Sequence, residues 1–153
     1  MNRNVIMRWL FHLSRFGLAA MFLFAAGAKL ATIKAFSLNV SELLSASHIS
    51  YLRWTWPVTI GVIVAEVLGA ILLMWLRTAR IGGFWAALLL VGFSSFALYY
   101  VYRLHGEPLE CGCFGGIIAS QLGVKTALRN LGLLVPALLV LFAARRNRPA
   151  THE

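Results

Sequence analysis

Two cysteines, Cys111 and Cys113, are the residues of this chain with the most distinctive chemistry. They are its only cysteines, and a single glycine separates them in the stretch Cys111-Gly-Cys113-Phe-Gly115. The stretch lies in a short polar segment between two long apolar ones, whereas inert cysteines are usually buried among apolar side chains. A pair of thiols in this setting indicates thiol–disulfide exchange or the binding of a soft metal ion.

A disulfide between these two cysteines would need a bent backbone. Two residues of extended chain span about 6.6–7.2 Å, and the Cα atoms of a disulfide usually lie about 4.4–6.8 Å apart. Gly112 permits the bend because it lacks a Cβ atom. The small ring would be strained, and strained disulfides are reduced more easily. Such a bond suits exchange better than bracing, because it closes too little chain to stabilise a fold much.

Polar neighbours affect the reactivity of the thiols in opposite directions. His105 can favour the thiolate or carry protons, although a loop histidine is more often simply solvated. Glu110, directly before Cys111, disfavours the thiolate through charge repulsion. A metal relay would need further thiols along its path, and the chain has none. We therefore expect a redox pair without a resident metal, and soft-metal transport is the alternative.

The composition is that of a membrane protein. Of the 153 residues, 60% are hydrophobic and 12% are charged, whereas soluble domains are about a quarter charged. This length allows one small helix bundle without a separate soluble domain. The net charge of +9 does not indicate nucleic-acid binding. The basic residues flank the apolar segments, where they act as topology signals and anchors to lipid headgroups.

Four stretches are apolar and long enough to cross a lipid bilayer, which takes about 20 residues of helix. They are residues 9–31, 56–76, 81–101 and 126–144. Residues 32–55 are too polar to cross but carry spaced apolar side chains, which predicts a short interfacial helix between the first two spans. The cysteines then lie in the loop of residues 102–125. The expected fold is an all-α bundle of four transmembrane helices, in a single domain over residues 1–153.

Lysine and arginine are unevenly divided between the two ends of this bundle. The N-terminus, the 77–80 turn and the C-terminal tail hold eight, and the opposite end holds six together with three glutamates. Because basic loops stay in the cytoplasm, we expect both termini on the cytoplasmic side of a bacterial inner membrane and the cysteine loop in the periplasm. A signal peptide cleaved after Ala26-Gly27-Ala28 is the competing interpretation, and it also leaves the cysteine loop outside.

Three charged residues fall within the first two expected spans. Glu66 lies ten residues after Trp56, about 15 Å into the second span and near the bilayer centre. A charge at that depth must be paired, neutralised or placed in a polar cavity. Arg15 and Lys29 of the first span are its candidate partners. Such a pair either serves helix packing alone or lines a pocket for protons or a quinone.

These residues resemble those of a known family, the MauE/DoxX-like redox-associated membrane proteins. The matching residues are Ala26-Gly27-Ala28-Lys29-Leu30, Phe36, Pro57, Glu66-Val-Leu-Gly69, Cys111-Gly-Cys113-Phe-Gly115 and Arg129-Asn130. The resemblance implies a DoxX-like four-helix fold and a role in maturing methylamine dehydrogenase, whose small subunit is rich in disulfides. It also implies a partner, the periplasmic thioredoxin-like protein MauD.

The four spans are similar to the DsbB and VKOR bundles too, although those enzymes use two cysteine pairs, one of them beside a quinone. With one pair, this protein either meets an electron carrier such as a quinone directly or relays electrons to a docked partner. We predict an inner-membrane protein in which the two cysteines exchange disulfides with a thioredoxin-fold partner. A soft-metal transporter or metallochaperone and a non-catalytic assembly factor are the alternatives. The predicted site residues are Cys111, Cys113, Glu66, Lys29, Arg15, Arg129, Asn130 and His105.

Overall fold

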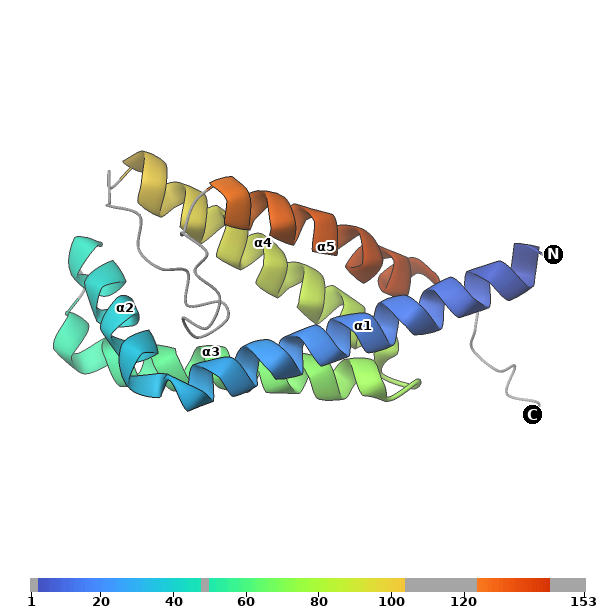
Figure 1. Ribbon diagram of the computed structural model, residues 1–153, viewed down its shortest axis with the longest axis horizontal. Helices are drawn as coiled ribbons and strands as arrows, with labels where there is room; N and C mark the ends of the chain where they lie inside the picture. The colour runs from blue at the N-terminus through green and yellow to red at the C-terminus, as the bar shows by residue number, and fades with distance from the viewer. Residues whose placement is uncertain (1–2, 48–49, 104–123, 144–153) are drawn as a thin grey trace.

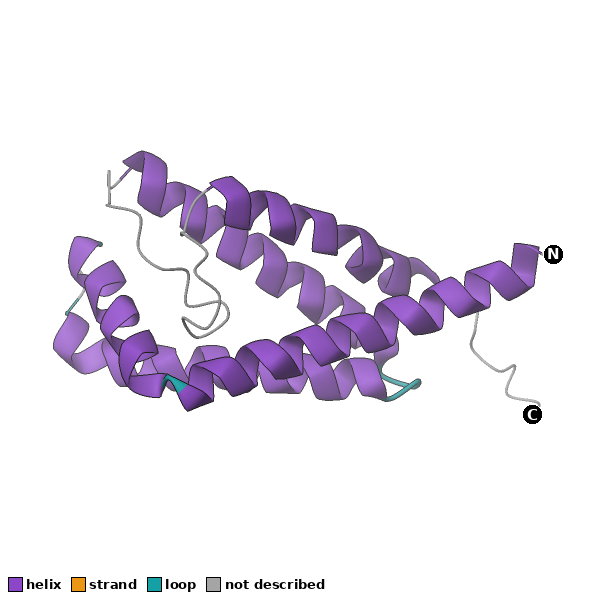
Figure 2. Cartoon of the chain, viewed as in Figure 1, coloured by secondary structure: helices purple, strands orange, loops and turns teal. Residues whose placement is uncertain are grey.

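The computed structural model of the protein describes residues 3–47, 50–103 and 124–143. In these ranges the chain is all-helical, with five α-helices and no strand (Figures 1 and 2). The all-α class predicted from the apolar runs is therefore confirmed for this part of the chain.

A long first helix and a short second helix are separated by one residue. α1 covers Arg3–Ala31 and α2 covers Ile33–Ala46. Thr32 leaves the helical conformation, with φ −118° and ψ 36°, and its hydroxyl donates to the carbonyl oxygen of Ala28 over 2.9 Å. The chain changes direction here, and α2 packs against α3 (Figure 1). A short helix thus follows the first span, and its location at the membrane interface stays a prediction.

The next two helices form an antiparallel hairpin. α3 covers Tyr51–Met74 and α4 covers Ala79–Arg103. Thr78 stabilises the turn between them, because its hydroxyl donates to the carbonyl oxygen of Leu72 over 2.9 Å. Further along, the indole N–H of Trp85 donates to the carbonyl oxygen of Ala65 over 3.0 Å. These bonds fix how α4 sits along α3.

α5 covers Val124–Ala143 and contains Pro136 in its interior. Three other helices are long and apolar enough to cross a membrane: Val5–Ala31 in α1, Arg53–Met74 in α3 and Ala79–Tyr99 in α4. In α5, the apolar stretch Ala127–Ala143 is shorter than these three. The structure therefore supports a multi-pass membrane protein, and the fourth span stays a prediction.

The long helices run back and forth between two ends of the molecule (Figure 1). The start of α1, the α3–α4 turn and the end of α5 point toward one end. α2, the start of α3, the end of α4 and the start of α5 lie toward the other, which we call the α2 end. Residues 104–123, which include both cysteines, follow α4 and precede α5, so they are attached to the described chain at the α2 end.

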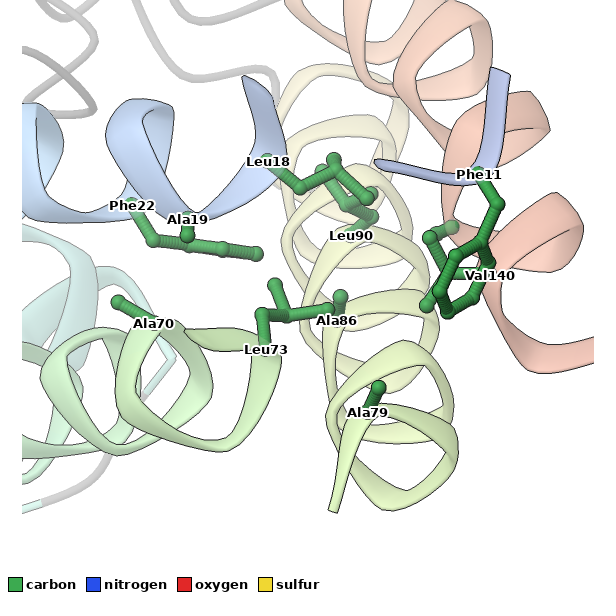
Figure 3. Close-up of a cluster of buried hydrophobic side chains, with 11 residues drawn as sticks. Phe11, Leu18, Ala19, Phe22, Ala70, Leu73, Ala79, Ala86, Leu90 and Val140 are labelled. Carbon is green, nitrogen blue, oxygen red and sulfur yellow. The ribbon is translucent and has the colours of Figure 1, made fainter. Parts of the chain in front are cut away.

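Apolar side chains from α1, α3, α4 and α5, many of them alanine, form the main core (Figure 3). Its buried members are Phe11, Leu18, Ala19, Phe22, Ala70, Leu73, Ala79, Ala86, Leu90, Ala137 and Val140. The alanines let the helices approach closely, which is how helices associate in a lipid environment. A second cluster of Ala26, Phe36, Val40 and Ile63 holds α2 against α1 and α3.

Two glycines of α4 bring backbones into direct contact. A Cβ atom on Gly82 would lie 2.8 Å from the backbone of Leu72 and Leu73. One on Gly83 would lie 2.9 Å from the backbone nitrogen of Leu141 in α5. Both distances are shorter than side-chain atoms tolerate. α4 can therefore pack closely on both of its neighbours only because these positions lack side chains.

The outer surface of the helices carries many large apolar side chains. Soluble monomers rarely expose such contiguous apolar surface, whereas a bilayer accepts it without cost. The most exposed of these residues include Trp9, Leu13, Trp75, Leu128, Val135 and Phe142. This surface fits the spanning helices and indicates contact with lipid.

Candidate functional site

A buried ion pair joins α1 to α3. The Nζ atom of Lys29 lies 2.6 Å from Oε1 of Glu66, to which it donates a hydrogen bond. Both residues are almost fully buried, at 3% and 2% exposure. Lys29 lies in the last turn of α1, where the helix dipole favours a positive charge. The ring of Phe36 in α2 lies 5.6 Å from the ammonium nitrogen, so a third helix covers the pair.

The pair solves the problem posed by a carboxylate in the middle of a span. An ionised group at the bilayer centre costs about 2.5–3.5 kcal/mol on insertion scales. A direct ion pair in a poorly hydrated site offsets part of that cost, although desolvating both groups remains unfavourable. Glu66 and Lys29 therefore stabilise the bundle only as a pair, and removing either one leaves a buried charge.

A small cavity of about 30 Å³ lies beside Glu66. Four helices contribute to its wall, which is lined by Met21, Phe22, Ala25, Glu66, Leu90, Phe93, Arg129, Asn130 and Leu133. Glu66 Oε2 and Asn130 Nδ2 are buried and have no hydrogen-bond partner among the described residues. The predicted residues Glu66, Arg129 and Asn130 are thus brought together by folding.

Arg15 lies away from this site and is not the partner of Glu66. It is 5% exposed, and its guanidinium carbon lies 4.5 Å from the ring centre of Phe16 and 5.9 Å from that of Phe11. Its Nε and Nη1 atoms have no hydrogen-bond partner in the described chain. The sequence allowed Glu66 to pair with either Arg15 or Lys29, and the structure contains the pair with Lys29. Arg15 interacts instead with aromatic rings of its own helix through cation–π contacts.

The remaining predicted residues, Cys111, Cys113 and His105, lie outside the described residues. Chain connectivity alone relates them to the cavity. Asn130 is seven residues into α5, which begins eleven residues after Cys113. The helix that follows the cysteine segment therefore carries two of the polar residues that line the cavity.

The apolar wall of the cavity was not predicted from the sequence. On α1, the contributing residues Met21, Phe22 and Ala25 precede Lys29 at helical spacing. Residues three or four apart share one face of a helix, so this spacing was a usable signal. It could not say which faces of α4 and α5 would meet this one, because that depends on the tertiary packing.

The size of the cavity limits what it can hold. A water molecule needs roughly 10–15 Å³ of such volume, so about 30 Å³ accommodates one or two waters. This volume is smaller than the ring of a quinone. Among the described residues, no group of three histidine, cysteine, aspartate or glutamate side chains is placed to hold a metal ion.

Three apolar helices of spanning length, two of which are joined by a buried ion pair, define a multi-pass membrane protein that is all-helical in the described residues. A family model described as "Methylamine utilisation protein MauE" matches residues 7–143, and the chain belongs to this family. The matched range includes the ion pair, the cavity and both cysteines. Comparison with curated proteins and with solved structures gives no match.

Proposed function

We propose that this MauE-family protein supports thiol–disulfide exchange on the outer side of the bacterial inner membrane, with Cys111 and Cys113 as the exchanging thiols. The observation that carries the proposal is the attachment of the cysteine segment. It joins α4 to α5 at the α2 end, and Arg129 and Asn130 of α5 then line the small cavity beside Glu66. The matching family is described by methylamine utilisation, and disulfide-rich methylamine dehydrogenase is the proposed client.

The proposed membrane topology has four spans in a DoxX-like bundle. Counted over Val124–Ala143, α5 is about 30 Å long, which matches the hydrocarbon thickness of a bilayer. Arg15 and Lys29 are buried inside the bundle, so they no longer count among the lysines and arginines that flank the membrane. One basic residue is thereby subtracted at each end of the bundle. Seven remain on the side of the termini and five on the other, so the bias toward cytoplasmic termini is kept. The cysteine segment then faces the periplasm.

The proposed exchange runs through a mixed disulfide. A thiolate of the reduced pair attacks one sulfur of a partner's disulfide, and the partner's other sulfur leaves as a thiolate. The second cysteine of the pair then attacks the mixed disulfide and releases the partner as a dithiol. Two electrons pass to the partner, and the Cys111–Cys113 bond forms. A thioredoxin-fold protein such as MauD is the proposed partner, and the same steps reverse when it is the reductant.

Single cysteine variants test this proposal sharply, because the chain has only two thiols. Cys111→Ala and Cys113→Ala should each abolish disulfide turnover of the partner. One of them should accumulate a mixed disulfide, since the resolving thiol is missing. Non-reducing gels and mass spectrometry of the trapped adduct give the partner and the attacking residue.

The double variant C111A/C113A is the matched control and should form no adduct. Full maturation of client disulfides in both single variants would show that the thiols are not catalytic. If the double variant also supports full maturation, the protein acts as a non-catalytic assembly factor instead.

A further inference from the structure

The first turns of α1 carry an open hollow outside the main core. Its described wall consists of Val5, Arg8, Trp9 and His12, and its volume is about 440 Å³. Ligand sites usually measure about 300–1,000 Å³, so the hollow is large enough for a polar headgroup. Arg8 and Trp9 are exposed and His12 is half-buried, so a ligand in the hollow can reach all three side chains.

Every ionisable residue on this face of α1 is basic. Arg8, His12 and Arg15 are four and three residues apart, so they share one face of the helix. α1 contains no acidic residue. The two glutamates of the described chain lie elsewhere, Glu42 in α2 and Glu66 in the buried ion pair of α3. Because no described acidic side chain offsets the positive charge here, the hollow favours an anion.

Aromatic rings hold two of these basic groups in place. The ring of His12 stacks on Phe16 with centres 6.5 Å apart, and it meets Phe11 in a T-shaped contact with centres 5.4 Å apart. The guanidinium carbon of Arg15 lies over the same two rings. The imidazole in the wall of the hollow is therefore restrained before a ligand arrives, and the buried charge of Arg15 adds to the positive potential from one helical turn away.

The position of the hollow and its apolar surroundings point to a lipid as the source of the anion. The first turns of α1 project beyond the α3–α4 turn, at which two candidate spans end and begin (Figure 1), so they reach the level of the lipid headgroups. Beside the basic face, Trp9, Leu13 and Phe16 form a second stripe at helical spacing. All three are exposed, at 74%, 72% and 50%. A free phosphate ion would leave this stripe uncovered, whereas an acyl chain would cover it.

We propose that the hollow binds one anionic phospholipid, with its phosphate against Arg8 and His12. One acyl chain then lies along Trp9, Leu13 and Phe16. The arginine supplies a charge-assisted hydrogen bond to the phosphate, and the imidazole supplies a second donor. Indole side chains favour the boundary between headgroups and acyl chains, which is where Trp9 would lie.

Such a site differs from the general attraction of basic residues to anionic lipid. The α3–α4 turn at the same end of the molecule also carries exposed arginines, Arg77 and Arg80, but neither lines the hollow. General attraction predicts that every exposed arginine at this end contributes alike. A binding site predicts that Arg8 contributes far more than Arg77, and that one lipid is bound at saturation.

Native mass spectrometry of the full chain, released from detergent and titrated with phosphatidylglycerol, distinguishes the two. We expect one tightly bound lipid per chain, and Arg8→Gln should weaken its binding about five-fold, the contribution of one arginine beside anionic lipid. Arg77→Gln is the matched control, because it removes the same charge from an exposed position at the same end. It should leave the affinity nearly unchanged. Equal weakening in the two variants, or none in Arg8→Gln, would overturn the site.

The choice of ligand tests the assigned chemistry. Phosphatidylcholine has the same phosphate with a balancing cation, so it should bind several-fold more weakly than phosphatidylglycerol. Equal binding of the two lipids would contradict an anion site. Excess inorganic phosphate should not displace the bound lipid, because it cannot cover the apolar stripe. Displacement by inorganic phosphate would show a site for small anions and would overturn the assignment to a lipid.

This inference does not rest on the proposed redox function, because it uses only residues of α1. The C111A/C113A variant should therefore bind phosphatidylglycerol with the wild-type affinity. Loss of lipid binding in that variant would contradict a site made by α1 alone. Failure of the redox proposal leaves the lipid site intact, and failure of the lipid site leaves the cysteine chemistry untouched.

Discussion

At the scale of single residues, the bundle depends on one lysine and one glutamate. The sequence identified Glu66 as a residue that needs a partner and offered two candidates. It could not choose between them, because Arg15 and Lys29 are 14 residues apart and the choice depends on how α1 is rotated and shifted against α3. The structure resolves this through the 2.6 Å contact of Lys29 with Glu66.

Breaking this pair should cost more than removing it entirely. Glu66→Gln and Lys29→Met should each lower the free energy of unfolding by about 3–5 kcal/mol, because the remaining charge is buried and unpaired. The double variant should recover most of the loss, since no buried charge remains. Thermal unfolding in detergent and abundance in the membrane measure the effect.

The same variants separate packing from catalysis at Glu66. A double variant that is abundant and has normal disulfide turnover at Cys111 and Cys113 excludes a catalytic role for Glu66. If either single variant is as stable as the wild type, the pair does not stabilise the bundle. A stable but inactive Glu66→Gln, not rescued by the second change, would favour a role in proton handling.

At the scale of elements, the helices follow from composition but their contacts do not. Each long apolar run became a helix, as the hydropathy of the sequence predicted. The close contact of α4 with α5 depends on Gly83, and a glycine in an apolar run signals only that some neighbour approaches. Which neighbour it is becomes visible only in the folded structure, where the backbone of Leu141 lies 2.9 Å from the missing Cβ.

Adding one methyl group at this contact should separate the two helices. Gly83→Ala places a Cβ against the backbone of α5, which cannot move aside as a side chain can. Overpacking of this kind costs about 1–3 kcal/mol. Gly92→Ala on the same helix is the matched control, because nothing lies within 4 Å of its position, and it should be neutral. A fall in melting temperature confined to the Gly83 variant is the expected result, and equal behaviour of both would contradict it.

At the scale of the whole molecule, the helices define two ends, and the charge distribution predicts which end faces the cytoplasm. The two cysteines report on this directly, because no other thiol exists in the chain. The sequence predicts a polar loop for the residues that carry them, and these residues lie outside the described ranges. Their membrane side, in contrast, is fixed by chain connectivity once the orientation of α4 or α5 is known.

We expect the cysteine segment to face the periplasm. In cells with a permeabilised outer membrane, a membrane-impermeant maleimide should label Cys111 and Cys113 after reduction without lysis of the inner membrane. C111A/C113A is the control for labelling of other proteins. Labelling that appears only after inner-membrane lysis would falsify both the orientation and the proposed extracytoplasmic exchange.

The ion pair also sets an order of events during synthesis of the chain. Lys29 and Glu66 are 37 residues apart, so α1 is made before its partner exists. At translation rates of roughly 5–20 residues per second, Lys29 waits about 2–7 s for Glu66 to be synthesised. Lys29 lies in the last turn of α1. Until Glu66 is synthesised, its long side chain can therefore reach the headgroup region of the membrane. The lysine can therefore enter the bundle interior only when α3 arrives, which makes the pairing a late step that a nascent chain truncated before Glu66 could never complete.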